Sequence, residues 1–383
     1  MLDLTKRLIT IPSVSYHEME IVRFISSLLG GRNIPHVVDT FNPRDYSSSG
    51  SGTTANIYVD TWADRSSDTV NEHDTLMLYA HMDVVKAEDH QFNPVVEDGR
   101  LFGRGTADMK TALAGLVHVL SQDYEMLRAL DKRLLFTFIA DEETTHTGIM
   151  RFVDQYKGGS LSNLYCLVME PTNNFRELDV GGKGTCHFYL EGSMKNVLQA
   201  LRGVLEKKPE LLGGCADQGD GFGPTTLSLT KVSPVEGITS DGLETFNGVS
   251  CHASRPYQGE NALELALQHY KDLTYVATPE SDSPNTIPSR AFYFLGNKGY
   301  EDTLCEAYID IRTNLVADKS GSLKQQMQDL LREYDVSFKI RTEAPTVSVE
   351  DRTLVDVCKG AVDYEVAETI AKGCTDASYM RSM

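Results

Sequence analysis

The chain contains few cysteines, and their arrangement argues against two common kinds of site. Its 383 residues include seven cysteines, an odd number without a Cys-x-x-Cys pair. An even number of closely spaced cysteines would indicate a disulfide-rich secreted domain, and Cys-x-x-Cys pairs would indicate a thiolate zinc site. The seven are instead scattered: Cys166, Cys186, Cys215, Cys251, Cys305, Cys358 and Cys374. We therefore expect reduced and mostly buried thiols.

Long hydrophobic runs and an excess of positive charge are also missing. No stretch approaches about 18 consecutive apolar residues, and the N-terminus has no basic region followed by an apolar run. The sequence therefore predicts neither a transmembrane helix nor a signal peptide, and we expect a cytoplasmic protein. With 36 basic against 55 acidic residues, the formal charge is −19. This charge argues against nucleic acid or an anionic membrane as a partner.

Short apolar segments that alternate with helical patterns fill the first half of the sequence. The length of the chain exceeds what one hydrophobic core usually sustains, so two domains are expected. Runs at 75–80, 134–140 and 165–169 have the length of strands buried on both faces. A further strand is expected at 56–59, and helical spacing occurs at 2–10, 15–29, 109–120 and 147–156. This alternation predicts βαβ units and a mostly parallel sheet.

The pattern changes after the glycine-rich segment 181–184. The predicted strands are then 185–191, 225–232, 291–296, 304–312 and 336–341, with helices at 194–206, 261–274 and 322–334, and at 352–361 in the tail. This mixture is typical of a separate α+β domain. The sequence therefore predicts an α/β fold. One domain, residues 1–181 and 345–383, has a mostly parallel sheet and is interrupted by an α+β domain, residues 182–344.

Each of the three buried strands is followed by groups that can bind a metal or transfer a proton. These are His81 and Asp83 after the first, Asp141, Glu142 and Glu143 after the second, and Glu170 after the third; Asp108 precedes the helix at 109–120. Because the carboxyl ends of parallel strands meet at one edge of a sheet, we expect these groups to converge. One imidazole among several carboxylates suits zinc, and also manganese or cobalt.

The individual roles are less constrained than the cluster. A single carboxylate at a strand end is more often a loop or helix-capping residue than a ligand. Asp83 is badly placed to share the metal of His81 but well placed to orient its imidazole. Adjacent Glu142 and Glu143 cannot both be simple ligands of one ion, so one ligand and one general base is the economical division.

These motifs resemble one metallopeptidase family. The segments His-Met-Asp-Val-Val at 81–85, Gly-Arg-Gly-Thr-Ala-Asp-Met-Lys at 103–110, Asp-Glu-Glu at 141–143 and Glu-Pro-Thr at 170–172 are similar to those of acetylornithine deacetylase, succinyl-diaminopimelate desuccinylase, aminoacylase and the glutamate carboxypeptidases. The resemblance implies two zinc ions bridged by Asp108. His81 and Glu170 would bind one ion and Glu143 the other. Glu142 would be the general base, which takes a proton from the attacking water and passes it to the leaving amine.

The second half carries weaker likenesses to the same family. Residues 251–256, Cys-His-Ala-Ser-Arg-Pro, resemble its lid motif, which implies that His252 stabilises the oxyanion, often in the other subunit of a dimer. Asn285 and Arg312 resemble positions near the substrate carboxylate, and Thr375 and Asp376 resemble a turn that lines the site. Ordinary capping and surface pairing are the alternatives for these four residues. The resemblance implies that residues 1–181 and 345–383 form the catalytic domain. Residues 182–344 would then be the lid or dimerisation domain, through which a homodimer forms.

The sequence departs from the family pattern in two places. About sixty residues, including a predicted helix and strand, separate Lys183-Gly184 from the lid histidine motif, where the family has a short connection. The family also has a last metal ligand, a histidine beyond the Gly-x-Thr-Asp turn, whereas the last histidine here is His269. Three explanations are open: a truncated sequence, a substitute ligand such as His146, or a second metal ion that is held poorly.

The activity expected from these features is metal-dependent hydrolysis of an amide bond in a small N-acyl amino acid, with a deacetylase or desuccinylase favoured by Glu170-Pro171-Thr172. A dipeptidase, carboxypeptidase or aminoacylase of the same family is the near alternative. A catalytically impaired relative that only binds amino-acid derivatives or short peptides is the alternative from a different class.

Overall fold

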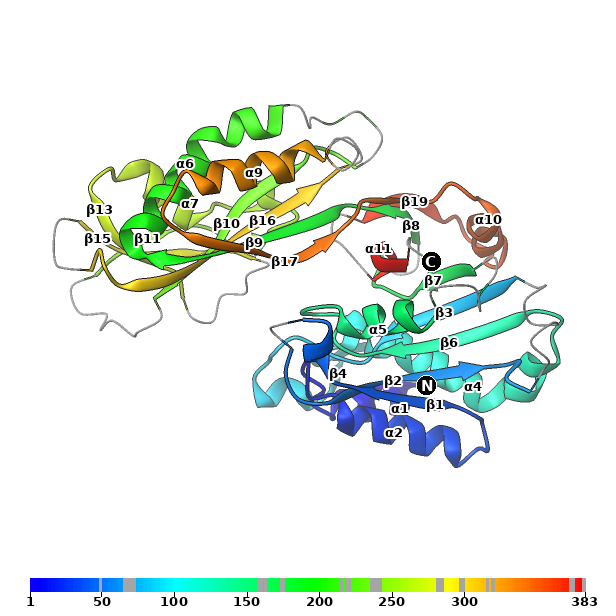
Figure 1. Ribbon diagram of the computed structural model, residues 1–383. Helices are drawn as coiled ribbons and strands as arrows, with labels where there is room; N and C mark the ends of the chain where they lie inside the picture. Colours follow the sequence, from blue (N-terminus) through cyan, green and yellow to red (C-terminus); the bar gives the residue numbers. More distant parts are fainter. Residues whose placement is uncertain are drawn as a thin grey trace. The chain divides into compact units, whose positions relative to one another are not determined.

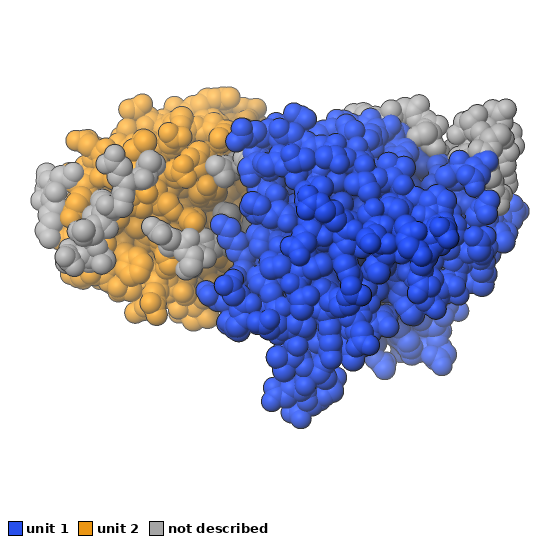
Figure 2. Space-filling model, turned by 90° about the horizontal axis from the view of Figure 1, so that it is seen from below, with its two compact units in different colours: residues 1–178, 351–367, 375–383 blue, residues 179–350, 368–374 orange. Residues whose placement is uncertain are grey.

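The chain folds into two compact units. The computed structural model describes residues 1–380 except 48–49, 65–73, 157–160, 162–163, 173–175, 214–216, 218, 220–221, 235–242, 280–285, 296–299, 315–316, 318–320 and 372–375. Unit 1 comprises residues 1–178, 351–367 and 375–383, and unit 2 comprises residues 179–350 and 368–374 (Figure 2). The chain therefore leaves unit 1 for unit 2 and later returns to it.

A five-stranded sheet of order β1-β2-β6-β3-β7 forms the centre of unit 1 (Figure 1). Its strands are β1 (Val37–Phe41), β2 (Thr54–Asp60), β3 (Thr75–His81), β6 (Arg133–Ile139) and β7 (Leu164–Val168). β3 pairs in parallel with both β6 and β7. β1 and β2 add antiparallel strands at one edge, which the sequence prediction of a mostly parallel sheet did not specify. The three chemically important strands are the parallel ones, and the α/β fold class is confirmed.

Helices cover both faces of this sheet. The described helices of unit 1 are α1 (Leu2–Ile9), α2 (Met19–Gly30), α4 (Thr111–Ala129), α5 (Thr147–Tyr156), α10 (Thr353–Gly360) and α11 (Ala377–Met380). Unit 1 also has a small hairpin of β4 (Val95–Glu97) and β5 (Arg100–Phe102). Helices α1, α2 and α4 lie on one side of the sheet and α5 on the other (Figure 1). Every residue of β6 is buried, as expected for a strand with a neighbour on each side and helices above and below.

Two predicted helices begin later than their spacing suggested, and the backbone explains both differences. The helix predicted at 15–29 starts at Met19 because Tyr16 adopts a left-handed conformation with φ 71°. The Tyr16 amide then donates to the Glu18 carboxylate, which also accepts from the Thr54 hydroxyl. The helix predicted from Met109 starts at Thr111, because Asp108 and Met109 are not helical. Apolar spacing continues through such turns, so the pattern alone cannot locate the first helical residue.

Unit 2 has an α+β architecture built from antiparallel sheets. One sheet has the order β10-β16-β9-β17 and another β11-β15-β13; β12 pairs with β14, and a three-stranded sheet has the order β18-β8-β19. The strands are β8 (Glu177–Gly182), β9 (Gly184–Ser193), β10 (Thr226–Pro234), β11 (Glu244–Asn247), β12 (Cys251–His252), β13 (Leu273–Ala277), β14 (Thr286–Ile287), β15 (Arg290–Leu295), β16 (Leu304–Thr313), β17 (Ser337–Ala344), β18 (Val347–Ser348) and β19 (Ala367–Ala371).

Three main helices pack on these sheets of unit 2: α6 (Met194–Gly213), α7 (Ala262–His269) and α9 (Ser322–Arg332). Their apolar faces share one hydrophobic core with the strands, which includes Phe188, Leu201, Leu229 and Met327. The helix predicted over 261–274 was wrong beyond His269, where the chain turns and continues as β13. In the part of the chain that the structure describes, no helix is both long and apolar enough to cross a bilayer.

Candidate metal centre

The strand ends of unit 1 bring five acidic and imidazole side chains together. His81 is the last residue of β3, Glu142 and Glu143 follow β6, and Glu170 follows β7. Because β3 pairs with both β6 and β7, the three strand ends are neighbours. Asp108 approaches from the segment before α4. The convergence that was predicted from sequence is therefore present in the structure.

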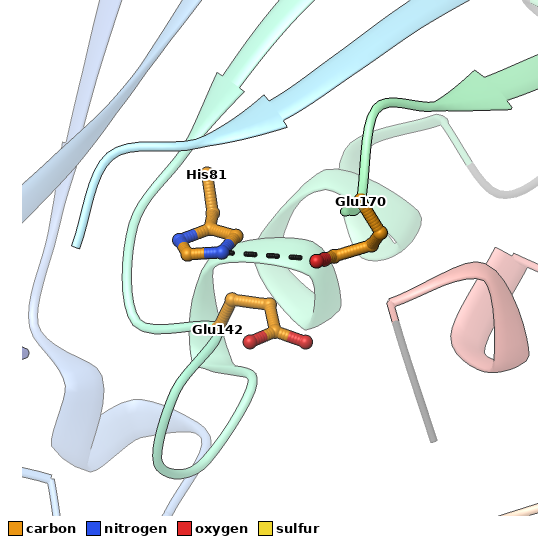
Figure 3. Close-up of side chains that lie close together, drawn as sticks. All are labelled: His81, Glu142 and Glu170. Atoms are coloured by element: carbon orange, nitrogen blue, oxygen red, sulfur yellow. Dashed lines mark ion pairs between the residues drawn. The ribbon is translucent and has the colours of Figure 1, made fainter. Parts of the chain in front are cut away.

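His81 lies at the centre of the cluster. Its Nε2 is 2.9 Å from Asp108 Oδ1 and 4.0 Å from Glu170 Oε1. Figure 3 shows His81, Glu142 and Glu170 converging from three different segments of the chain. Around His81 there are two sets of possible ligand atoms, and within each set the atoms lie within 4.8 Å of one another. One set is His81 with Glu142 and Glu170, and the other is His81 with Asp108 and Glu143. Together the two sets offer one imidazole and four carboxylates, enough ligands for two neighbouring cations.

Asp83 holds the loop after β6 in place. Its buried carboxylate accepts hydrogen bonds from the Ser15 hydroxyl at 2.7 Å and from the amides of Glu142 and Glu143 at 3.0 and 3.1 Å. The expected contact with His81 takes a different form: His81 Nδ1 is 3.0 Å from the Asp83 carbonyl oxygen and 3.4 Å from its carboxylate. Asp83 therefore fixes the two glutamates as well as the imidazole, and sequence reasoning missed the contribution of Ser15.

Asp141 shapes the same loop from the other side. It adopts a left-handed backbone with φ 59°, and its buried carboxylate accepts hydrogen bonds from the hydroxyls of Thr144, Thr145 and Thr147. These contacts close the turn that leads into α5 and cap the first residues of that helix. Asp141 is thus a structural residue that turns the chain so that the two following glutamates project from the loop.

The environment raises the pKa of three carboxyl groups of the cluster, those of Glu142, Glu143 and Glu170. Burial is the main cause for Glu143, whose pKa is about 7, and for Glu170, whose pKa is about 8. Burial and the neighbouring Glu170 charge hold the pKa of Glu142 well above its usual range. Burial alone would lower the pKa of His81, but hydrogen bonds to Asp108 and Asp83 and the nearby Glu170 charge hold it well above its usual value.

These features fit a divalent cation. Burying several carboxylates together is costly unless a positive charge compensates them. Glu170 Oε1 is buried and has no hydrogen-bond partner among the described residues; its ion pair with His81 Nε2 is 4.0 Å long, so this oxygen can serve as a metal ligand. Oxygen ligands combined with one imidazole suit zinc, manganese or cobalt. The residues present therefore fit a metal centre in unit 1.

Unit 2 places His252 and Arg312 in different surroundings. His252 lies in the short strand β12, where its Nδ1 accepts from the Ser254 amide at 3.1 Å. This contact assigns the ring proton to Nε2. Desolvation by the surrounding chain, followed by the nearby Arg312 charge, lowers the pKa of His252. The imidazole is therefore a neutral donor, the form that can hydrogen-bond an oxyanion.

Arg312 belongs to a buried polar group on the sheet of unit 2. Its Nε and NH2 groups form a two-point contact with the Asp310 carboxylate, at 2.9 and 2.7 Å. His187 Nε2 is 2.8 Å from the same carboxylate. Sequence reasoning named Arg312 but missed Asp310 and His187. The available signal was alternation: Asp310 and Arg312 share one face of β16, and His187 lies opposite Asp310 on β9. Asn285 and Thr375 lie outside the described residues.

Comparison with known proteins matches the chain to one family of peptidases, and two of its curated relatives are desuccinylases by name. The sequence profile of peptidase family M20/M25/M40 matches residues 77–383. Succinyl-diaminopimelate desuccinylase of Buchnera aphidicola subsp. Baizongia pistaciae is 30% identical over 293 residues, covering 70% of this chain and 73% of that protein. The enzyme of the same name from Cupriavidus necator is 28% identical over 201 residues, which cover 47% of this chain and 52% of the relative.

Solved structures share the fold at low sequence identity. A tripeptidase from Staphylococcus aureus superimposes with a TM-score of 0.55 at 15% identity, covering 100% of this chain and 86% of that one. Human carnosine dipeptidase 1 superimposes with a TM-score of 0.56 at 14% identity, covering 99% and 86%. These likenesses concern the fold alone.

Proposed function

The chain belongs to peptidase family M20/M25/M40, and on this premise we propose that it removes the acyl group from a small N-acyl amino acid. Family membership makes it a metal-dependent hydrolase of amide or peptide bonds. The finer assignment to a desuccinylase or deacetylase is supported by the two relatives named succinyl-diaminopimelate desuccinylase. The observation that carries the proposal is the convergence of His81, Asp108, Glu142, Glu143 and Glu170 at one edge of the sheet.

Zinc is the metal we propose, held as a pair. Asp108 would contact both ions, with His81 and Glu170 at one and Glu143 at the other, and cobalt or manganese could replace zinc. Such a pair supplies Lewis acidity to the scissile carbonyl and lowers the pKa of water to near neutrality. The sets of neighbouring ligand atoms around His81 place Glu170 in one set and Glu143 with Asp108 in the other, so Glu170 and Glu143 are separated as this division requires.

Glu142 is the proposed general base. It follows β6 in the cluster, and its backbone amide is fixed by the Asp83 carboxylate at 3.0 Å. A carboxylate held in this way can take the proton from the attacking water and return it to the leaving amine. Burial holds the pKa of Glu142 well above its usual range, which makes it a stronger base than an exposed glutamate.

Unit 2 would contribute the groups that recognise the substrate. We assign His252 to the oxyanion, because its neutral ring keeps a proton on Nε2. We assign Arg312 to the substrate carboxylate by the resemblance of its position, with Asp310 holding its guanidinium in place. Asn285 and Thr375 are proposed as further contacts by resemblance. A homodimer formed through unit 2 is part of the same proposal, since the lid histidine of the family often acts in the other subunit.

A substrate screen tests the proposal. Acetyl-, succinyl- and formyl-amino acids and a series of dipeptides are incubated with the protein after loading with zinc or cobalt, and release of the free amine is measured. We expect hydrolysis of at least one acyl-amino acid at a higher kcat/KM than any dipeptide. Preferential cleavage of dipeptides would replace the proposed activity by that of a dipeptidase. Binding of these compounds without turnover by the metal-loaded protein would contradict a hydrolase.

A further inference from the structure

A third group of ligand-type side chains adjoins the metal centre. Glu142, His146 and Asp376 offer ligand atoms that lie within 4.8 Å of one another. Glu142 and His146 come from the loop between β6 and α5, whereas Asp376 directly precedes α11. All three belong to unit 1. Glu142 is also in the set with His81 and Glu170, so it is shared between the centre described above and this third group.

Asp376 is the deepest member of the group. It is fully buried, and its two oxygens accept separate hydrogen bonds: Oδ1 is 2.8 Å from His146 Nδ1, and Oδ2 accepts from the Tyr79 hydroxyl at 2.5 Å. His146 is only 9% exposed, and its ring packs against Tyr379 with the centroids 5.0 Å apart. The imidazole and the carboxylate are therefore both held in defined positions, which keeps the loss of conformational entropy on binding a cation small.

The negative charge around this group is not balanced by basic side chains. Among the described residues, Glu142, Glu170 and Asp376 form no ion pair with a lysine or arginine, and their only ion pairs are with histidines. The buried Glu170 Oε1, in one ligand set with Glu142, has no hydrogen-bond partner in the described part of the chain. A cation from solution would supply the missing positive charge.

We propose that Glu142, His146 and Asp376 form an additional binding site for a divalent cation of the zinc type, and that filling it inhibits the enzyme. An imidazole with two carboxylates prefers zinc or cobalt to magnesium or calcium. When Nδ1 of His146 binds the ion, the ring proton moves to Nε2, and the two ionised carboxylates complete three protein ligands. Inhibition follows because Glu142, once bound to this ion, can no longer accept a proton from water. The binding site stands on the geometry alone, whereas the inhibition rests on the proposed function.

Metal binding by variants tests the site directly. His146→Asn is the informative change, because His146 has a left-handed backbone with φ 56° that asparagine tolerates well, while the imidazole is lost. The protein is dialysed against a series of free zinc concentrations, and bound zinc is counted by mass spectrometry. At high free zinc we expect the variant to bind one ion fewer than the wild type, or to bind it at least about tenfold more weakly.

Two further variants keep the result interpretable. His90→Asn replaces an exposed histidine of unit 1 and is expected to bind as much zinc as the wild type. Asp376→Asn removes the second ligand, so the same loss is expected if His146→Asn fails to fold. Equal zinc binding by wild type and both site variants, over the whole concentration range, would overturn the proposed site.

Activity measurements then separate the site from its effect. The ratio of activity at high zinc to activity at stoichiometric zinc should be low for the wild type and closer to one for His146→Asn. If the variant loses the extra ion but keeps the same ratio, the site stands and the inhibition is wrong. If no acyl-amino acid or peptide is hydrolysed by any form, the proposed function fails, while the zinc count still decides whether the site exists.

Discussion

The buried glutamates of the metal centre in unit 1 and the buried Asp310 of unit 2 have pKa values shifted in opposite directions. In unit 1, burial raises the pKa of Glu143 to about 7 and of Glu170 to about 8, because the cluster contains several acids and few protein cations. In unit 2, the Arg312 and His187 charges overcome the effect of burial and hold the pKa of Asp310 far below its usual range. Side chains of unit 2 compensate the buried charge of Asp310, whereas Glu143 and Glu170 of unit 1 depend on a bound cation for that compensation.

This difference has a functional meaning. A carboxylate that already has a guanidinium partner gains little from a metal ion, so Asp310 is a positioning residue for Arg312. A carboxylate such as Glu170, which is buried with an oxygen that accepts no hydrogen bond from the described residues, gains most of its stabilisation when the ion arrives. We therefore expect changes in unit 1 to act on chemistry and metal dependence. Changes in unit 2 should act on oxyanion and substrate contacts or on stability, without loss of metal.

The largest effect is expected for Glu142→Gln. The amide cannot accept a proton, so turnover should fall by about 10²- to 10⁴-fold, the usual range for a positioned base. At stoichiometric zinc, bound metal measured by mass spectrometry should stay near the wild-type amount, because Glu142 is not a proposed ligand of the zinc pair. Near-normal turnover would show that Glu142 is not the base, and a large loss of metal would make it a ligand instead.

His252→Ala is the matching change in unit 2. Loss of one oxyanion donor should lower kcat by about 10²- to 10³-fold and change KM little. Metal content should be unaffected, which separates this variant from changes in the metal centre. Sedimentation of the wild type and the variant measures the oligomeric state. A monomer whose His252→Ala variant keeps full activity would contradict both the oxyanion role and the proposed dimer.

Arg312→Met examines the compensated charge. The substitution leaves Asp310 buried without its guanidinium, which should cost about 3–5 kcal/mol of unfolding free energy. Hydrogen exchange should report the loss in β9 and β16 of unit 2, since these strands carry His187, Asp310 and Arg312. The double change Asp310→Leu with Arg312→Met removes both charges and should recover much of the stability. No recovery would mean that the pair is not the reason for the loss.

The last expected effect is a pH dependence in the metal-free protein. Glu143 and Glu170 have folded pKa values above their ordinary 4.5, so the folded state binds more protons than the unfolded state between about pH 4.5 and 7 or 8. Their contribution is present at low pH and is lost as pH rises, by on the order of 1 kcal/mol per pH unit for each group. The melting temperature of the chelated protein should fall from pH 5 to pH 8.

Two controls accompany this pH measurement. Glu143→Gln should shrink the slope of the chelated protein, because an amide does not titrate there. Added zinc should reduce the change of melting temperature with pH in the wild type, because the bound ion compensates the buried negative charge at every pH in this range. A chelated protein that becomes more stable as pH rises would show that the carboxyl groups are not destabilised by burial, which would remove the contrast with unit 2.

Much of unit 1 follows from local patterns in the sequence. The runs at 75–80, 134–140 and 165–169 form β3, β6 and β7. Full burial was correct for β6, where every position is buried, but wrong for the edge strand β7, which is half-buried along its length. The helix predicted at 147–156 has the bounds that the structure gives to α5. Unit 2 was harder to predict at its helix ends: the apolar spacing at 261–274 contains both α7 and the start of β13, which periodicity alone cannot separate.

The sequence by itself determined which residues could form the metal centre, since the acids and His81 follow the strands whose ends must meet. Only the tertiary structure decided which partners they have. It joined His146 to Asp376, which are 230 residues apart in the chain, and it placed Asp83 beneath the amides of Glu142 and Glu143. The physical reason is that periodicity reports which face of an element is buried, whereas pairing between distant loops depends on how the folded backbone brings them together.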